Sequence, residues 1–187
     1  MKKKKIIVLG TIILLGTAPI STLNIPFVQS HNIVYAATSN QKNAVRSAKN
    51  YAKTMHMSKQ AIFDQLTSEF DKFSEEDAQY AVDKIKVNYK KNALKSAKNY
   101  SKMMHMSKQG IYDQLISEAG DKFTEKEAQY AVDKLKADYN KNALKSAKNY
   151  QKTMAMSSDA IYEQLISPAG DKFTEEEAQY AVDNLDK

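Results

Sequence analysis

The residues that could carry chemistry are few, and they recur at matching places along the chain. The 187 residues include no cysteine, which excludes a thiolate metal site, a cysteine nucleophile and a disulfide framework. His56 and His105 hold equivalent positions in a repeat whose third copy has Ala155 there, and a required ligand or base would not be replaced in this way. Since the chain also has no Gly-rich phosphate loop and no nucleophile motif, we predict a protein that is not an enzyme and binds no metal or cofactor.

Charged side chains form two groups that could bind a partner. Lysines recur at 4, 3, 4 spacing along one helix face, and glutamates cluster at the start of another helix. The ordinary interpretation is a solvated face and a favourable interaction with a helix N-terminus. The functional interpretation is contact with a partner, strengthened because several copies act together. The candidate partner-binding residues are Glu125, Glu127, Glu175 and Glu177 on the acidic side, and Lys95, Lys98, Lys102, Lys145, Lys148 and Lys152 on the basic side.

These residues belong to a unit that occurs three times. The segment NALKSAKNY stands at 92–100 and again at 142–150, with NAVRSAKNY at 43–51, and AQYAVD occurs once in each copy. A period near 50 residues with this identity indicates a tandem repeat. We expect the copies at residues 43–85, 92–135 and 142–185.

Each copy has the pattern of three helices. The second helix is predicted to begin at a serine cap, at Ser58, Ser107 or Ser157. It is predicted to end near Gly120 or Gly170 in a left-handed residue. The first copy lacks that glycine, so we expect its turn to be one residue tighter. The third helix is predicted to begin with a capping box, Thr124 with Glu127 or Thr174 with Glu177, and with a weaker version at Ser74 and Asp77. Phe123 and Phe173, which precede the caps, are expected in the core.

The stretch between copies determines the expected architecture. Residues 124–156 contain neither Gly nor Pro and are rich in helix formers, and an equivalent stretch covers residues 74–106. We predict that the third helix of one copy continues without a break into the first helix of the next. The predicted fold is therefore all-α, with three tandem three-helix, helix-turn-helix-like repeats joined by long continuous helices after an N-terminal signal segment.

The N-terminal segment has the three parts of a secretory signal. Lys2–Lys5 form a charged start, Ile6–Leu15 an apolar core, and Val34-Tyr35-Ala36 a small-residue cleavage pattern. We expect residues 1–36 to be a signal peptide, with cleavage after Ala36 or Ala37. The alternative is an uncleaved anchor, which would be the chain's one membrane contact. The long segment and the lack of cysteine suit export from a Gram-positive bacterium, so the protein is expected to be secreted or associated with the cell surface or wall.

A DNA-binding role is a minor alternative. The second helix, the turn and the third helix are similar to a helix-turn-helix, whose second helix presents its N-terminal end to DNA. Here that end carries carboxylates, as in Glu75, Glu76 and Asp77, which would repel phosphates. Without Lys2–Lys5 the remaining charge is nearly balanced. We therefore expect no nucleic-acid partner.

The repeat NALKSAKNYSKMMHMSKQGIYDQLISEAGDKFTEKEAQYAVDKL resembles that of the Ltp family, host cell surface-exposed lipoproteins of Gram-positive bacteria and their prophages. The resemblance covers all three copies, and it implies tandem helix-turn-helix units joined by a stiff helix. It also implies superinfection exclusion, in which a prophage-encoded surface protein stops incoming phage DNA by engaging the phage tape measure protein. The chain departs from the family in lacking the cysteine that would carry a lipid.

Two functions are therefore expected outside the cell. The first is a non-enzymatic binding protein whose repeats engage a phage protein through the acidic candidates. The alternative is a module that binds cell-wall or other anionic polymers through its lysine-rich helix faces.

Overall fold

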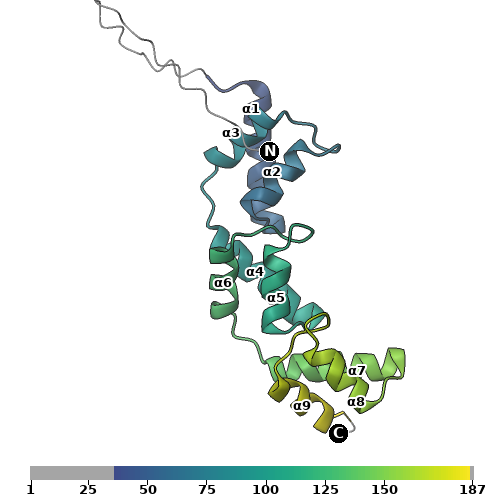
Figure 1. Ribbon diagram of the computed structural model, residues 1–187. Helices are drawn as coiled ribbons and strands as arrows, with labels where there is room; N and C mark the ends of the chain where they lie inside the picture. Colours follow the sequence, from purple (N-terminus) through teal and green to yellow (C-terminus); the bar gives the residue numbers. More distant parts are fainter. Residues whose placement is uncertain (1–35, 186–187) are drawn as a thin grey trace, which may run out of the picture. The chain divides into compact units, whose positions relative to one another are not determined.

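The computed structural model describes residues 36–185, and this part of the chain contains helices and no strand. The helices form three successive three-helix repeats (Figure 1). The expectation of an all-α fold made of three tandem repeats is confirmed. The segment expected to be a signal peptide lies outside the described residues, apart from Ala36.

Each repeat has the same order of elements. The first helix is α1 (Ser39–Asn50, continued by the π-helical turn η1, Tyr51–Met55), α4 (Tyr89–Met104) or α7 (Tyr139–Met154). The second helix is α2 (Lys59–Thr67), α5 (Lys108–Ile116) or α8 (Ser158–Ile166). The third helix is α3 (Glu75–Lys84), α6 (Glu125–Lys134) or α9 (Glu175–Asp183).

Every repeat encloses its own small core. In the second repeat, alanines of α4 and α6 pack against Ile111 and Leu115 of α5, both of them fully buried. Small side chains on the first and third helices let the two backbones approach closely. The largest fully buried side chains of this repeat, Ile111 and Leu115, come from α5. Phe123 and Phe173 are buried in their cores, as predicted.

The predicted helix starts are confirmed. The hydroxyls of Ser58, Ser107 and Ser157 accept hydrogen bonds from backbone N–H groups in the first turns of α2, α5 and α8. Thr124 and Thr174 form complete capping boxes with Glu127 and Glu177, whereas Ser74 forms the weaker, one-sided cap. Local sequence determines these starts because a cap satisfies N–H groups that the helix itself leaves free.

The prediction that the second helix ends in a left-handed glycine is wrong. The residue with positive φ is Lys122, at 54°, or Lys172, at 58°. Gly120 is required for a different reason, since a Cβ there would lie 2.5 Å from the carbonyl oxygen of Gln114. The expectation of a tighter first turn is confirmed, because the Phe73 N–H bonds to Leu66 seven residues back and the Phe123 N–H bonds to Leu115 eight residues back.

The prediction of continuous helices between repeats is also wrong. The chain leaves the helical conformation at Ile85 (ψ 139°) and at Leu135 (ψ 111°), and α4 and α7 begin only at Tyr89 and Tyr139. The breaks are visible in Figure 1 between α3 and α4 and between α6 and α7. Ile85 and Leu135 turn toward the cores of their own repeats. Burial of these side chains outweighs the helix propensity of the polar residues around them.

A new cap starts the next helix after each break. The side chains of Asn88 and Asp138 accept hydrogen bonds from the N–H groups of Lys91 and Lys141. Each connection is therefore a short, defined segment with a stop and a start of its own. Among the described residues, no helix combines the length and the apolar character needed to cross a membrane.

Candidate functional site

The four candidate glutamates divide into two kinds. Glu127 and Glu177 are half-buried, and their carboxylates accept hydrogen bonds from the N–H groups of Thr124 and Thr174, each at 3.0 Å. Glu125 and Glu175 are exposed on the same first turns. The first pair therefore stabilises helix starts, and the second pair is available to a partner.

The six candidate lysines all lie exposed on two first helices. Lys95, Lys98 and Lys102 are on α4, and the matching lysines 145, 148 and 152 are on α7. Lys98 and Lys102 line a cleft of about 460 Å³ together with Lys134 and Lys136. Lys95 does not line it, and neither do the four candidate glutamates.

The same kind of cleft occurs in the first repeat. Its lining includes Lys49, Lys53 and Lys86, and its volume is about 430 Å³. In both repeats one wall is the end of the first helix and the other is the extended connection to the next repeat. Sequence reasoning missed the lysines of the connection because it treated this segment as helix. The signal was present in the repeated Lys84-Ile85-Lys86 and Lys134-Leu135-Lys136.

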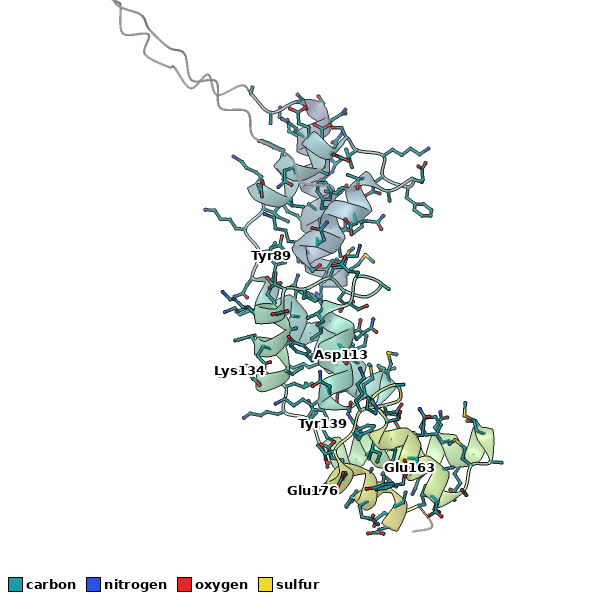
Figure 2. All side chains as sticks on the ribbon, in the orientation of Figure 1. Tyr89, Asp113, Lys134, Tyr139, Glu163 and Glu176 are labelled. Atoms are coloured by element: carbon teal, nitrogen blue, oxygen red, sulfur yellow. The ribbon has the colours of Figure 1, made fainter. Side chains whose placement is uncertain are left out.

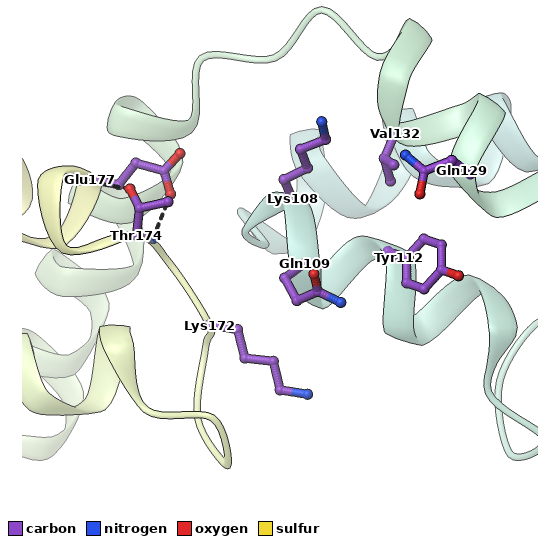
Figure 3. Close-up of a pocket in the computed structure, with 8 residues that line it drawn as sticks. All are labelled: Lys108, Gln109, Tyr112, Gln129, Val132, Lys172, Thr174 and Glu177. Atoms are coloured by element: carbon purple, nitrogen blue, oxygen red, sulfur yellow. Dashed lines mark hydrogen bonds between the residues drawn. The ribbon is translucent and has the colours of Figure 1, made fainter. Parts of the chain in front are cut away.

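A second cleft recurs where one repeat meets the next. Between the second and third repeats it has a volume of about 380 Å³. Figure 3 shows side chains of α5 and α6, such as Tyr112 and Gln129, on one side and Lys172, Thr174 and Glu177 on the other. The equivalent cleft between the first and second repeats has a volume of about 370 Å³.

Ion pairs cross both of these junctions. Lys122 Nζ lies 2.6 Å from Asp64 Oδ2, and Lys172 makes the same contact with Asp113. Partial burial acts to raise the pKa of Asp113, but hydrogen bonds from Lys172 and Gln109 outweigh it and lower that pKa. The pKa of Asp64 is lowered by the equivalent balance. Each pair therefore favours the ionised carboxylate at neutral pH.

A buried asparagine makes a second contact across each junction. Asn92 Nδ2 donates to the carbonyl oxygens of Ala52 and Met57, at 3.0 and 3.1 Å. Asn142 Nδ2 donates to Ser101 Oγ at 2.9 Å and to the Met106 carbonyl at 3.0 Å. The start of each new first helix thus satisfies polar groups at the end of the previous one, where a helix leaves its last carbonyls unpaired.

Five tyrosines have raised pKa values, mainly because of burial. The hydroxyls of Tyr89 and Tyr139 are buried without a hydrogen-bond partner, and their pKa values are raised to about 12. Figure 2 labels both residues, which follow the two connections. The other three, Tyr51, Tyr100 and Tyr150, donate to partly buried aspartates, and the Tyr100 hydroxyl lies 2.8 Å from Asp121 Oδ1. The tyrosine–aspartate pairs join the first helix of each repeat to the turn before its third helix. Within residues 36–185 no cluster of side chains is placed to hold a metal ion.

Comparison with known proteins identifies the repeat. The family model described as host cell surface-exposed lipoprotein matches residues 39–85, 88–135 and 138–185. The chain belongs to this lipoprotein family. Its three matched segments account for nearly all of the described residues.

A solved structure is similar to part of this family member. It is the structure of Ltp, a superinfection exclusion protein from the Streptococcus thermophilus temperate phage TP-J34. The two are 44% identical with a TM-score of 0.50, over 54% of this chain and 100% of the other. No match is found among curated proteins.

Proposed function

We propose that this family member is a non-enzymatic binding protein, secreted or held at the cell surface, that blocks superinfection by contacting a protein of the incoming phage. The phage tape measure protein is the proposed partner. The observation that carries the proposal is the three-fold match to a surface-exposed family, together with 44% identity to a superinfection exclusion protein.

The proposed contact surface is the exposed acidic first turn of each third helix. It comprises Glu125 on α6, Glu175 and Glu176 on α9, and Glu75 and Glu76 on α3, all exposed. A single exposed ion pair contributes little. Three similar acidic turns in one chain raise the affinity for an extended basic segment. Once one turn has bound the segment, the other two meet it at a high effective concentration.

Entry of phage DNA tests the proposal. The gene is expressed in a susceptible host, and adsorbed phage and intracellular phage DNA are measured separately. We expect normal adsorption and reduced DNA entry. Normal DNA entry in cells that display the protein at their surface would refute the proposal.

Matched charge variants locate the surface. Replacing Glu125, Glu175 and Glu75 by Gln is expected to restore DNA entry in part, because it removes proposed contacts with the phage protein. The fold is expected to be kept, because these side chains make no cap. Glu69→Gln and Glu118→Gln, which remove exposed carboxylates from the turns between helices, are the control and are expected to leave exclusion unchanged.

The lysine-lined clefts support a second candidate function, the binding of anionic wall polymers. Four lysines, from α4, the end of α6 and the connection after α6, line one cleft, and a similar cleft occurs in the preceding repeat. Retention on purified cell walls that falls steeply with salt is expected here. Lys98→Glu with Lys102→Glu is expected to reduce retention strongly, with the remainder carried by the cleft of the first repeat. Lys95→Glu, on the same helix but outside the cleft, is expected to preserve most of it.

A further inference from the structure

The two junctions between repeats use one set of contacts. The earlier repeat supplies an aspartate from its second helix and backbone carbonyls after its first helix. The later repeat supplies a lysine from the turn before its third helix and an asparagine from its first helix. The pairs are Asp64 with Lys122, Asp113 with Lys172, Asn92 with Met57 and Asn142 with Met106.

Within residues 36–185, half of this set is unused in the first repeat. Lys72 is the counterpart of Lys122 and Lys172, and Asn43 is the counterpart of Asn92 and Asn142. Lys72 and Asn43 are exposed, whereas Asn92 and Asn142 retain only 7% of their accessible surface. Lys72 has the same left-handed backbone, with φ 54°, as the two lysines that make ion pairs. Its backbone therefore has the conformation found at both internal junctions.

The other half is unused in the third repeat. Glu163 on α8 takes the place of Asp64 and Asp113, and it is exposed (Figure 2). Ser157 is exposed too, although its counterparts Ser58 and Ser107 retain only 1% of their surface. Ser107 Oγ donates to the backbone carbonyl of Asp171 across the junction. The acceptor for an asparagine is the backbone carbonyl of Met156, which no side-chain change removes.

We propose that the third repeat of one molecule docks on the first repeat of a second copy and repeats the internal junction. Glu163 pairs with Lys72, Asn43 donates to the Met156 carbonyl, and Ser157 donates to the backbone carbonyl of Asp71. A second copy is the fitting partner because it carries the complementary lysine, asparagine and carbonyl at the repeat positions used twice within each chain, with one residue fewer between Asn43 and Lys72.

The consequence is an open chain of molecules. The contact is heterologous, since the two surfaces belong to different repeats, and each added molecule presents a fresh free surface. The internal junction rests on one partly exposed ion pair and a few hydrogen bonds, so the contact between separate molecules is weak in dilute solution. It forms where the protein is concentrated.

Zero-length cross-linking tests this contact. Ordinary and ¹⁵N-labelled protein are mixed at high concentration and treated with a carbodiimide, which joins lysine amines to carboxylates. Links of Asp64 to Lys122 and of Asp113 to Lys172 are the internal reference. We expect a Lys72–Glu163 link that joins a labelled to an unlabelled peptide. Internal links without this mixed link would overturn the proposal.

Charge exchange tests the pair itself, with concentration-dependent sedimentation as the readout. Lys72→Glu and Glu163→Lys are each expected to remain monomeric, whereas the protein carrying both changes regains association. A mixture of the two single variants is expected to associate into chains in which they alternate, because the unchanged Glu163 and Lys72 meet at one contact and the two replaced side chains, again opposite in charge, meet at the next. Lys126→Glu, an exposed change on α6, is expected to associate like the wild type. Association of both single variants, or none in the double variant, would refute the contact.

Discussion

Nζ of Lys122 lies 2.6 Å from Oδ2 of Asp64, a residue 58 positions earlier in the chain. The contact joins the turn before α6 to α2 of the preceding repeat, and Lys172 with Asp113 repeats it one junction later. Repeats of this size have small cores. Contacts between neighbours therefore carry a share of the stability, as in other repeat proteins.

The first prediction concerns the pH dependence of this junction. Hydrogen bonds from Lys172 and Gln109 lower the pKa of Asp113 in spite of its partial burial. A lowered pKa in the folded state adds stability above the ordinary aspartate pKa of about 3.9, and this stability is lost as pH falls through the lowered value. Since both side chains of the pair are about a third exposed, Asp113→Asn is expected to cost below about 1 kcal/mol at neutral pH.

Urea unfolding across a pH series checks this prediction. The difference between wild type and Asp113→Asn is expected to be steady from neutral pH to about pH 4 and to vanish below it. Glu69→Gln, an exposed change in the turn after α2, serves as the control. A difference that persists in strong acid would show that the ion pair is not its source.

The second prediction concerns the buried asparagine of the second junction. Asn142→Ala removes the donors to Ser101 Oγ and the Met106 carbonyl and leaves that carbonyl unsatisfied, so the free energy of unfolding is expected to fall by about 1–3 kcal/mol. Asn43→Ala changes the exposed counterpart in the first repeat and is expected to have almost no effect in dilute solution. Equal effects of the two changes in chemical denaturation would contradict a role for the junction.

The features determined by short stretches of sequence were the predictable ones. The serine caps, the capping boxes at Thr124 and Thr174, and the shorter first turn depend on residues within a few positions of one another. Their chemistry is local, because a side chain near a helix start bonds the nearest free N–H groups.

The features that failed depend on distant packing. The stretch from Lys134 to Tyr139 has no Gly or Pro, and helix propensity alone continues the helix through it. Leu135 leaves the helix because it packs against the core of its own repeat. The error also hid Lys134 and Lys136 as partners of Lys98 in one cleft. The junction contacts of Asn92 and Asn142 were not foreseen, because they join residues about 40 positions apart.

The third prediction separates a required glycine from a replaceable one. A Cβ at Gly120 would lie 2.5 Å from the Gln114 carbonyl oxygen, so Gly120→Ala is expected to destabilise the protein by about 1–3 kcal/mol. Gly110→Ala meets its nearest atom, Ser107 Oγ, at 3.1 Å, and alanine occupies the same position in the other two repeats. Its effect is expected to be small, because the tighter contact is offset by better helix propensity.

Deletion of Gly120 is a further test of the same turn. The first repeat closes this turn with one residue fewer, so the deletion is expected to cost less than Gly120→Ala. Thermal unfolding ranks the three variants. A deletion more damaging than the substitution would show that the steric contact with Gln114 does not explain the glycine.

The fourth prediction contrasts two tyrosines at high pH. The Tyr139 hydroxyl is buried without a partner, and burial, followed by the charge of Glu177, raises its pKa to about 12. A raised pKa in the folded state means that the neutral tyrosine supports the fold below the ordinary value of about 10, and that this support is lost as pH rises toward about 12. Tyr139→Phe abolishes this loss of stability at high pH, because phenylalanine does not ionise. It breaks no hydrogen bond, because the Tyr139 hydroxyl makes none. We expect near wild-type stability at pH 7 and greater stability than wild type at about pH 11.

Tyr100→Phe is the matched contrast, because it removes the 2.8 Å hydrogen bond to Asp121, whose pKa is itself raised by burial. It is expected to cost about 1–3 kcal/mol at neutral pH, and denaturation curves in which both variants lose stability alike would reject the distinction between the two hydroxyls.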